Sequence, residues 1–162
     1  MKHLVSALLL LSFIACDDQT NKEQVLQNRI DSLEQKLNET YKPGFGEFMS
    51  NIQVHHEKLW FAGANENWKL ADFEIHEIME SLDDIKQFET DRPESKEIDM
   101  LNPAIDSMNN AITKKDVALF KSSFIFLTNT CNNCHRTVNF EFNVVKLPET
   151  PPFSNQDFKV EK

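Results

Sequence analysis

The segment Cys131-Asn132-Asn133-Cys134-His135 has the residue types and the spacing for cofactor chemistry. Its two thiols lie three residues apart, close to one helical turn, and its imidazole directly follows the second thiol. Thiols at this spacing can reach the two vinyl groups at one edge of a porphyrin, and the imidazole then meets the iron from one face. The sequence therefore predicts one covalently attached haem c, with Cys131 and Cys134 as thioether residues and His135 as the proximal iron ligand.

Three other interpretations of this segment compete with covalent haem. A structural zinc site needs four ligands, and the segment offers three. A redox-active dithiol usually lies at a helix N-terminus beside a βαβ unit, whereas this segment ends a helix in a chain without that pattern. A chance match has no reason to continue the apolar face of its helix, as Cys131 and Cys134 both do. Covalent haem is therefore the favoured interpretation.

Four helical segments must position the motif, and each has one apolar face. The connections between them are short, and only three glycines occur in the whole chain, which argues against a β-rich domain. We therefore expect an all-α fold, an antiparallel four-helix bundle with the covalent haem near the end of the fourth helix. The segments cover about residues 45–63, 66–89 and 95–112, and then residue 117 to the motif.

Local signals set the expected ends of these helices. The first helix is expected to stop at Gly63. In the third, Pro103 either kinks the helix or marks its true start, with Asn102 as the cap. The spacing of Thr113 to Asp116 is that of a capping box, which would open the fourth helix at residue 117.

The N-terminus carries an export signal. Lys2 is followed by an apolar run to Ala15, which is too short to span roughly 30 Å of hydrocarbon as a helix. The letters FIAC, ending at Cys16, resemble the bacterial lipobox, in which the cysteine is lipidated and becomes the new N-terminus. We expect a signal peptide over 1–15 and lipid attachment at Cys16, on the periplasmic side of a bacterial membrane; ordinary cleavage after Ala15 is the alternative.

The mature chain is expected to have three parts. Residues 16–42 form a lipid-anchored tether or a short coiled coil, because residues 26, 30, 33 and 37 are apolar with coiled-coil spacing. A homo-oligomer formed through residues 24–38 is the partner that this spacing would favour. The haem-binding bundle covers 43–147 and begins at the Pro43-Gly44 pair. A proline-containing tail covers 148–162 and either folds back over the haem edge or is disordered.

The charge of the chain restricts its partners. The formal net charge is −9 at pH 7, and loss of Lys2 with the signal peptide makes it one unit more negative. Such a field repels phosphate backbones, so nucleic acid is not an expected partner, whereas a basic redox protein is. No hydrolytic triad, paired catalytic carboxylates or phosphate-binding loop is apparent, so the chain is not expected to be an enzyme.

The helix order and the motif near the end of the fourth helix resemble the class II c-type cytochromes, the four-helix cytochrome c′ group. The resemblance covers about residues 44–140 and rests on helix order and motif placement. It implies haem at one end of the bundle and a role in electron transfer. The chain departs from the family after His135: Arg136 follows directly, and the aromatic residues come later, at Phe140 and Phe142.

The resemblance leaves the sixth iron position open, because some family members leave it vacant and others fill it with a methionine of the first helix. Met49 lies near the start of that helix, level with the motif, and either binds the iron or fills a gap in the core. His56, two turns further along the same face, is the weaker candidate, and a hydrogen bond to Glu57 or Glu80 is its alternative role. His76 lies off the apolar face and is expected at the surface.

The expected function follows from these residues. The leading interpretation is an exported, membrane-tethered monohaem c-type cytochrome that carries electrons to a redox partner protein. The first alternative is a five-coordinate haem protein that binds NO or CO for gas binding or sensing. The second is a structural lipoprotein with zinc at the motif.

Overall fold

The computed structural model describes residues 20–37, 40 and 43–160 of the 162-residue chain. By its internal contacts the chain divides into two compact units, residues 1–42 and residues 43–162. The division falls directly before the Pro43-Gly44 pair, where the sequence predicted a boundary. The predicted signal peptide and Cys16 lie outside the described residues.

In the first unit, residues 20–37 form a helix whose described side chains are all exposed. The predicted apolar stripe lies on this helix. Its large apolar side chains are open to solvent at Val25, Leu26, Ile30, Leu33 and Leu37. This exposure is what a helix needs if its stripe is to pack against another helix, and oligomerisation through it stays a prediction.

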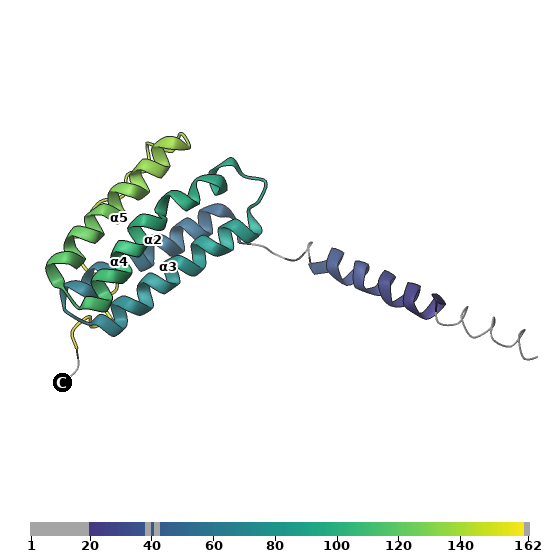
Figure 1. Ribbon diagram of the computed structural model, residues 1–162, viewed down its shortest axis with the longest axis horizontal. Coiled ribbons are helices and arrows are strands. Elements are labelled where there is room, and N and C mark those ends of the chain that lie inside the picture. Colours follow the sequence, from purple (N-terminus) through teal and green to yellow (C-terminus); the bar gives the residue numbers. More distant parts are fainter. Residues whose placement is uncertain (1–19, 38–39, 41–42, 161–162) are drawn as a thin grey trace, which may run out of the picture. The chain divides into compact units, whose positions relative to one another are not determined.

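The second unit is helical, and no strand occurs among its described residues. Figure 1 shows its four α-helices lying side by side, with short connections between them. The predicted all-α class is therefore confirmed. In chain order the elements are α2 (Phe45–Ala64), α3 (Trp68–Phe88), the 3-10 helix η1 (Pro93–Leu101), α4 (Asn102–Lys114) and α5 (Val117–Thr137).

Each α-helix buries the face that its apolar periodicity indicated. The largest fully buried side chains come from every element of the bundle: Leu59 of α2, Ile75, Ile78 and Ile85 of α3, Ile98 of η1, Met108 of α4, and Phe120, Phe124 and Leu127 of α5. Phe88 continues the apolar spacing of α3, but it lies at the end of that helix and is 42% exposed.

The third predicted helix is two elements in the structure. Residues 93–101 form a 3-10 helix, and α4 begins at Asn102, with Pro103 in its first turn. Pro103 thus marks the true start of the α-helix, although the N-cap residue is Leu101 and not Asn102. The buried residues Ile98 and Leu101 are three apart, a spacing that places side chains on one face of either kind of helix.

The predicted capping box at Thr113–Asp116 is wrong. Thr113 belongs to α4, and Lys115 ends that helix in a left-handed conformation. The cap of α5 is Asp116 alone, whose side chain accepts a hydrogen bond from the Leu119 backbone N–H at 3.0 Å. The carboxylate also lies at the positive end of the helix dipole, which stabilises it there.

Three helices end on a residue with positive φ, and none of these residues is glycine. Glu66 (φ 59°), Lys115 (φ 53°) and Asn139 (φ 62°) are those residues. After each of them the next backbone N–H bonds to the carbonyl five residues back, as in Asn67 N–H to Ala62 O at 2.9 Å. These are Schellman endings, which satisfy carbonyls that the helix leaves free.

Gly63 therefore does not end the first helix as predicted, and its role is close packing. It lies inside α2, and a Cβ atom placed on it would lie 2.1 Å from Cζ of the buried Phe120 ring. The bare backbone of Gly63 is what lets α2 approach α5 at this level.

Helices α2 and α5 run antiparallel in a fixed register. Gly63 lies against Phe120, the Trp60 and Phe124 rings are 5.0 Å apart, and His56 bonds to Thr128. From one pair to the next, the residue number falls by three or four in α2 and rises by four in α5. The start of α2 therefore lies beside the end of α5, where the Cys-x-x-Cys-His motif is.

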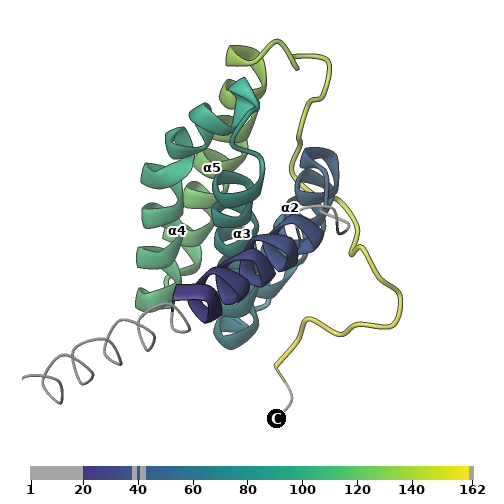
Figure 2. The same ribbon diagram turned by 90° about the vertical axis from the view of Figure 1, so that its right-hand side faces the viewer.

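After α5 the chain turns and runs back along the bundle, which Figure 2 shows as the yellow segment. Phe158 is buried (4% exposed), and its ring centroid lies 5.6 Å from that of Phe61 of α2. Lys58 Nζ lies 5.4 Å from the centroid of the Phe153 ring. The segment after α5, residues 139–160 and called the tail from here on, thus packs on the bundle. That residues 148–162 fold back over the haem edge stays a prediction.

Within residues 20–37 and 43–160, no helix combines the length and the apolar character needed to cross a membrane.

Candidate functional site

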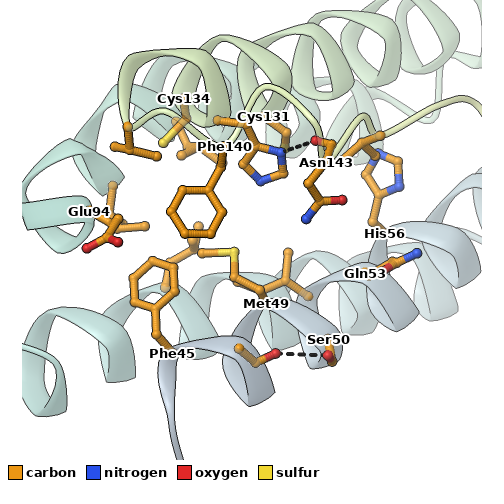
Figure 3. A pocket seen from close by; sticks show the side chains of 18 of the residues that line it. Phe45, Met49, Ser50, Gln53, His56, Glu94, Cys131, Cys134, Phe140 and Asn143 are labelled. Atoms are coloured by element: carbon orange, nitrogen blue, oxygen red, sulfur yellow. Dashed lines mark hydrogen bonds between the residues drawn. The ribbon is translucent and has the colours of Figure 1, made fainter. Parts of the chain in front are cut away.

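A cavity of about 430 Å³ lies between the start of α2, the end of α5, η1 and the tail. Figure 3 shows residues of α2 and α5 projecting into it from opposite walls. Most of its lining is apolar. It includes Phe45, Met49 and Ile52 of α2, Ile98 and Leu101 of η1, and Phe140, Val144 and Val145 of the tail.

The motif residues Cys131, Cys134 and His135 all line this cavity. Both cysteines are free thiols; Cys134 is buried and Cys131 is half-buried. Burial raises the pKa of Cys131 to about 12, with a smaller contribution from Cys134, and burial followed by the charge of Glu97 raises the pKa of Cys134. Both therefore stay protonated near neutral pH, unlike the low-pKa thiol of a redox-active dithiol.

The ring of His135 is oriented by the tail. Its Nδ1 lies 2.6 Å from the backbone carbonyl oxygen of Asn143, and a dashed line marks this contact in Figure 3. A carbonyl oxygen can only accept a hydrogen bond, so Nδ1 must carry the proton. In the neutral imidazole the lone pair is then on Nε2, the nitrogen that remains available to an iron.

His56 lines the same cavity but has a partner of its own. Its Nε2 lies 2.9 Å from Oγ1 of Thr128, whose hydroxyl bonds the Phe124 carbonyl at 2.9 Å. Since the hydroxyl proton goes to that carbonyl, Nε2 of His56 is the donor to Thr128. Burial lowers the pKa of His56 to about 4, so the ring is neutral near pH 7. The predicted partners Glu57 and Glu80 are not the ones observed.

The register of the two helices places Met49 level with His135 and away from His56. His56 is level with Thr128, and Met49 is seven residues before His56, just as His135 is seven residues after Thr128. Two antiparallel helices advance about 10 Å over seven residues, so Met49 is level with His135 and His56 is about 10 Å away along the bundle. In Figure 3, Met49 lies in the middle of the cavity, with His56 towards the end away from Cys134.

His55 faces away from this cavity into a buried pair. Its Nδ1 lies 2.6 Å from Oε2 of Glu74, whose side chain is 1% exposed, and its Nε2 lies 3.8 Å from Glu77. Oε1 of Glu74 has no hydrogen-bond partner among the described residues. The sequence analysis gave Glu74 no role. Glu74 lies three residues after the buried Ala71 and four before the buried Ile78, and this helical spacing could have indicated its burial. His76 is exposed at the surface, as expected.

An arginine–glutamate pair at the cavity wall was not predicted. Arg92 donates to Glu94 through Nε at 3.3 Å and Nη2 at 3.0 Å, and its guanidinium lies 5.0 Å from the Phe45 ring centroid. The hydrogen bond from Arg92 lowers the pKa of Glu94. Both residues line the cavity, and among the residues that the structure describes no other arginine and no lysine does so. No periodicity in the sequence marks this pair.

In the described part of the chain, no three His, Cys, Asp or Glu side chains lie together as metal ligands do. A porphyrin supplies four nitrogen ligands itself, so haem iron needs only one or two side chains. The cavity meets that need, since it brings two protonated thiols, an imidazole with a free Nε2 and a thioether to one apolar space. The donor set therefore fits a c-type haem.

Comparisons with protein-family models, with curated proteins and with solved structures find no match to this chain.

Proposed function

We propose that this protein is an exported, membrane-tethered monohaem c-type cytochrome that transfers electrons and is not an enzyme. One observation carries the proposal: Cys131, Cys134, His135 and Met49 line a single apolar cavity, with Met49 level with His135. This is the donor set that a covalently attached, six-coordinate haem requires. The fold it implies is the four-helix haem bundle of the class II cytochromes.

The two cysteines would hold the porphyrin. Each S–H would add across one vinyl C=C bond: the sulfur would bond to one carbon, the thiol proton would go to the other, and no oxidant would be needed. Burial raises the pKa of both thiols, so they would serve as attachment points and not as thiolate ligands.

The other residues of the cavity would set the environment of the metal. When bound, the haem supplies one-electron chemistry at its iron. His135 presents Nε2, because Nδ1 is held by Asn143, and Met49 presents its thioether from the opposite helix. The apolar lining would keep water from the metal, and Arg92 and Glu94 would stand at the cavity wall as an ion pair.

The location and partners of the proposed cytochrome follow from the sequence outside the bundle. Residues 1–15 would direct export, and Cys16 would carry the lipid that anchors the chain to a bacterial membrane. The acidic net charge suits a basic redox protein and not nucleic acid. The exposed stripe of residues 20–37 would pack against the same helix of a second copy.

The role of Met49 separates this function from gas binding. If Met49 holds the iron together with His135, the ferric protein should be low-spin, show the weak far-red band of thioether ligation and react slowly with CO. Met49→Ala should abolish that band, make the iron high-spin and open it to CO. His56→Ala should leave the spectrum unchanged, because His56 is committed to Thr128.

Optical spectra of the three proteins test these expectations directly. A wild type that is already high-spin and binds CO rapidly would make Met49 a core residue and favour the gas-binding function. A change of spin state in His56→Ala alone would indicate two histidine ligands. Either result contradicts methionine ligation while leaving covalent haem in place.

A further inference from the structure

The side chain of Asn132, inside the Cys-x-x-Cys-His motif, binds the tail of the protein. Its Nδ2 donates to the carbonyl oxygen of Val145 at 2.8 Å, and its Oδ1 accepts from the Val145 N–H at 2.8 Å. The N–H and the carbonyl of Val145, 13 residues further along the chain, are thus both paired with the amide of Asn132. No other described side chain makes two hydrogen bonds to one backbone residue of the tail.

The segment between the motif and Val145 is held at both ends. At its start, the Schellman ending at Asn139 directs the Phe140 N–H to the carbonyl of His135 at 2.7 Å. At its end, Asn132 holds Val145. Between these points, the Asn143 N–H bonds the Phe140 carbonyl at 2.9 Å and forms a turn.

This turn determines where the Asn143 carbonyl points, and it points at Nδ1 of His135 with a 2.6 Å contact. Asn143 and Val145 are two residues apart, so we expect that release of Val145 loosens this turn and with it the carbonyl. A hydrogen bond at the second nitrogen of a metal-binding histidine fixes its tautomer, orients its ring and raises its basicity.

We propose that Asn132 is a positioning residue for the haem iron, acting through Val145 and the Asn143 carbonyl on His135. The inference rests on the proposed haem function, since it concerns the ligand that His135 supplies. We call the two hydrogen bonds between Asn132 and Val145 the clamp. A more basic imidazole stabilises ferric iron over ferrous iron, so the clamp lowers the reduction potential. The same clamp places Phe140, Val144 and Val145 along the cavity.

The motif contains its own matched control, because Asn133 is the same residue type one position later. Its side chain is exposed and accepts a hydrogen bond from Arg136, and it makes no hydrogen bond to a described residue of the tail. Asn132→Leu removes both hydrogen bonds to Val145 and keeps a side chain of similar size. Asn132→Asp keeps the acceptor for the Val145 N–H and loses the donor to its carbonyl. Asn133→Leu tests the change of residue type alone.

The experiment measures two quantities on each full-length, haem-loaded protein. Hydrogen exchange followed by mass spectrometry reports the protection of residues 140–147, and spectroelectrochemistry reports the midpoint potential. We expect Asn132→Leu to lose protection in this segment and to shift the potential positive, Asn132→Asp to fall between, and Asn133→Leu to match the wild type. In a Met49→Ala background, where the iron is open to CO, the Fe–His stretching frequency after CO photolysis should fall along the same series.

Different outcomes overturn different parts of the proposal. Unchanged protection in Asn132→Leu would show that Asn132 does not hold the tail. Lost protection with an unchanged potential and Fe–His frequency would show that the tail does not act on His135. If a variant takes up no haem, exchange and the ¹⁵N shifts of His135 in the unloaded chains decide whether the clamp exists. A wild type without covalent haem would contradict the proposed function instead, and the unloaded measurements would still test the clamp.

Discussion

His56 and His135 line one cavity, yet their ring nitrogens are used in opposite ways. His135 donates a hydrogen bond from Nδ1–H to a backbone carbonyl and keeps Nε2 free, whereas His56 donates from Nε2–H to Thr128. A ring whose free nitrogen faces a cofactor space can bind a metal, and a ring engaged with a buried hydroxyl serves packing and structure. The same residue type therefore has two different roles about 10 Å apart along the bundle.

The burial of His56 predicts a pH dependence of stability in the unloaded protein. Burial lowers its pKa from 6.5 to about 4, so between these values the unfolded chain binds a proton that the folded chain does not. The contribution of His56 is fully present above pH 6.5 and is lost as the pH falls towards 4. The loss is at most about 3 kcal/mol for a shift of this size.

Urea unfolding across this pH range, with two histidine variants, isolates the effect of His56. His56→Gln should lose less stability than the wild type as the pH falls, because it has no proton to gain. His76→Gln is the matched control, since His76 is exposed and should leave the pH dependence unchanged. Parallel curves for wild type and His56→Gln would contradict a depressed pKa in the folded state.

The residue types of the site were predictable, but most of their partners were not. The motif is read from adjacent letters, and helical periodicity was enough to put Met49 and His56 on the face towards it. Thr128 lies 72 positions from His56, and the carbonyl of Asn143 belongs to a segment that has no periodicity. Backbone acceptors leave no trace in side-chain patterns, so the orientation of His135 became visible only in three dimensions.

At the scale of the elements, the contact between α2 and α5 depends on the absence of one Cβ atom. Gly63→Ala would place that atom 2.1 Å from Cζ of Phe120, a ring that is fully buried and has no room to retreat. We expect destabilisation by about 1–3 kcal/mol, the range for overpacking a core. Chemical denaturation of the unloaded protein measures the change.

Gly46 provides the control within the same helix. A Cβ atom on Gly46 has no neighbour within 4 Å, so Gly46→Ala should stabilise α2 by about 0.5–1 kcal/mol through the lower entropy of the unfolded chain. Equal effects of the two substitutions would contradict close packing at Gly63, because helix propensity alone favours alanine at both positions.

The existence and type of the α-helices were predictable, whereas their ends were not. Apolar periodicity is repeated over many residues, so it survives local exceptions such as Phe88. Helix ends depend on single residues, and here Glu66, Lys115 and Asn139 adopt the left-handed conformation that usually indicates glycine. For residues 93–101 the buried positions suit both an α-helix and a 3-10 helix, and periodicity could not distinguish them.

At the scale of the whole molecule, the proposal places the haem unit on a membrane through its N-terminus. Cys16→Ser should release a periplasmic form with an unchanged haem spectrum, because the bundle of residues 43–160 contains the whole cavity. Membrane fractionation and intact mass of the wild type measure the anchor. A wild type that is already soluble and carries no lipid mass would contradict lipidation at Cys16.

The central claim is that Cys131 and Cys134 hold one haem covalently, and acid–acetone extraction with a pyridine haemochrome spectrum tests it most directly. The protein should be purified from a host with a haem-attachment system, beside a variant with both cysteines changed to serine. We predict a c-type α band, one haem per chain and no extractable haem in the wild type, with haem lost or extractable in the variant. Extractable haem in the wild type, or zinc in its place, would contradict the claim.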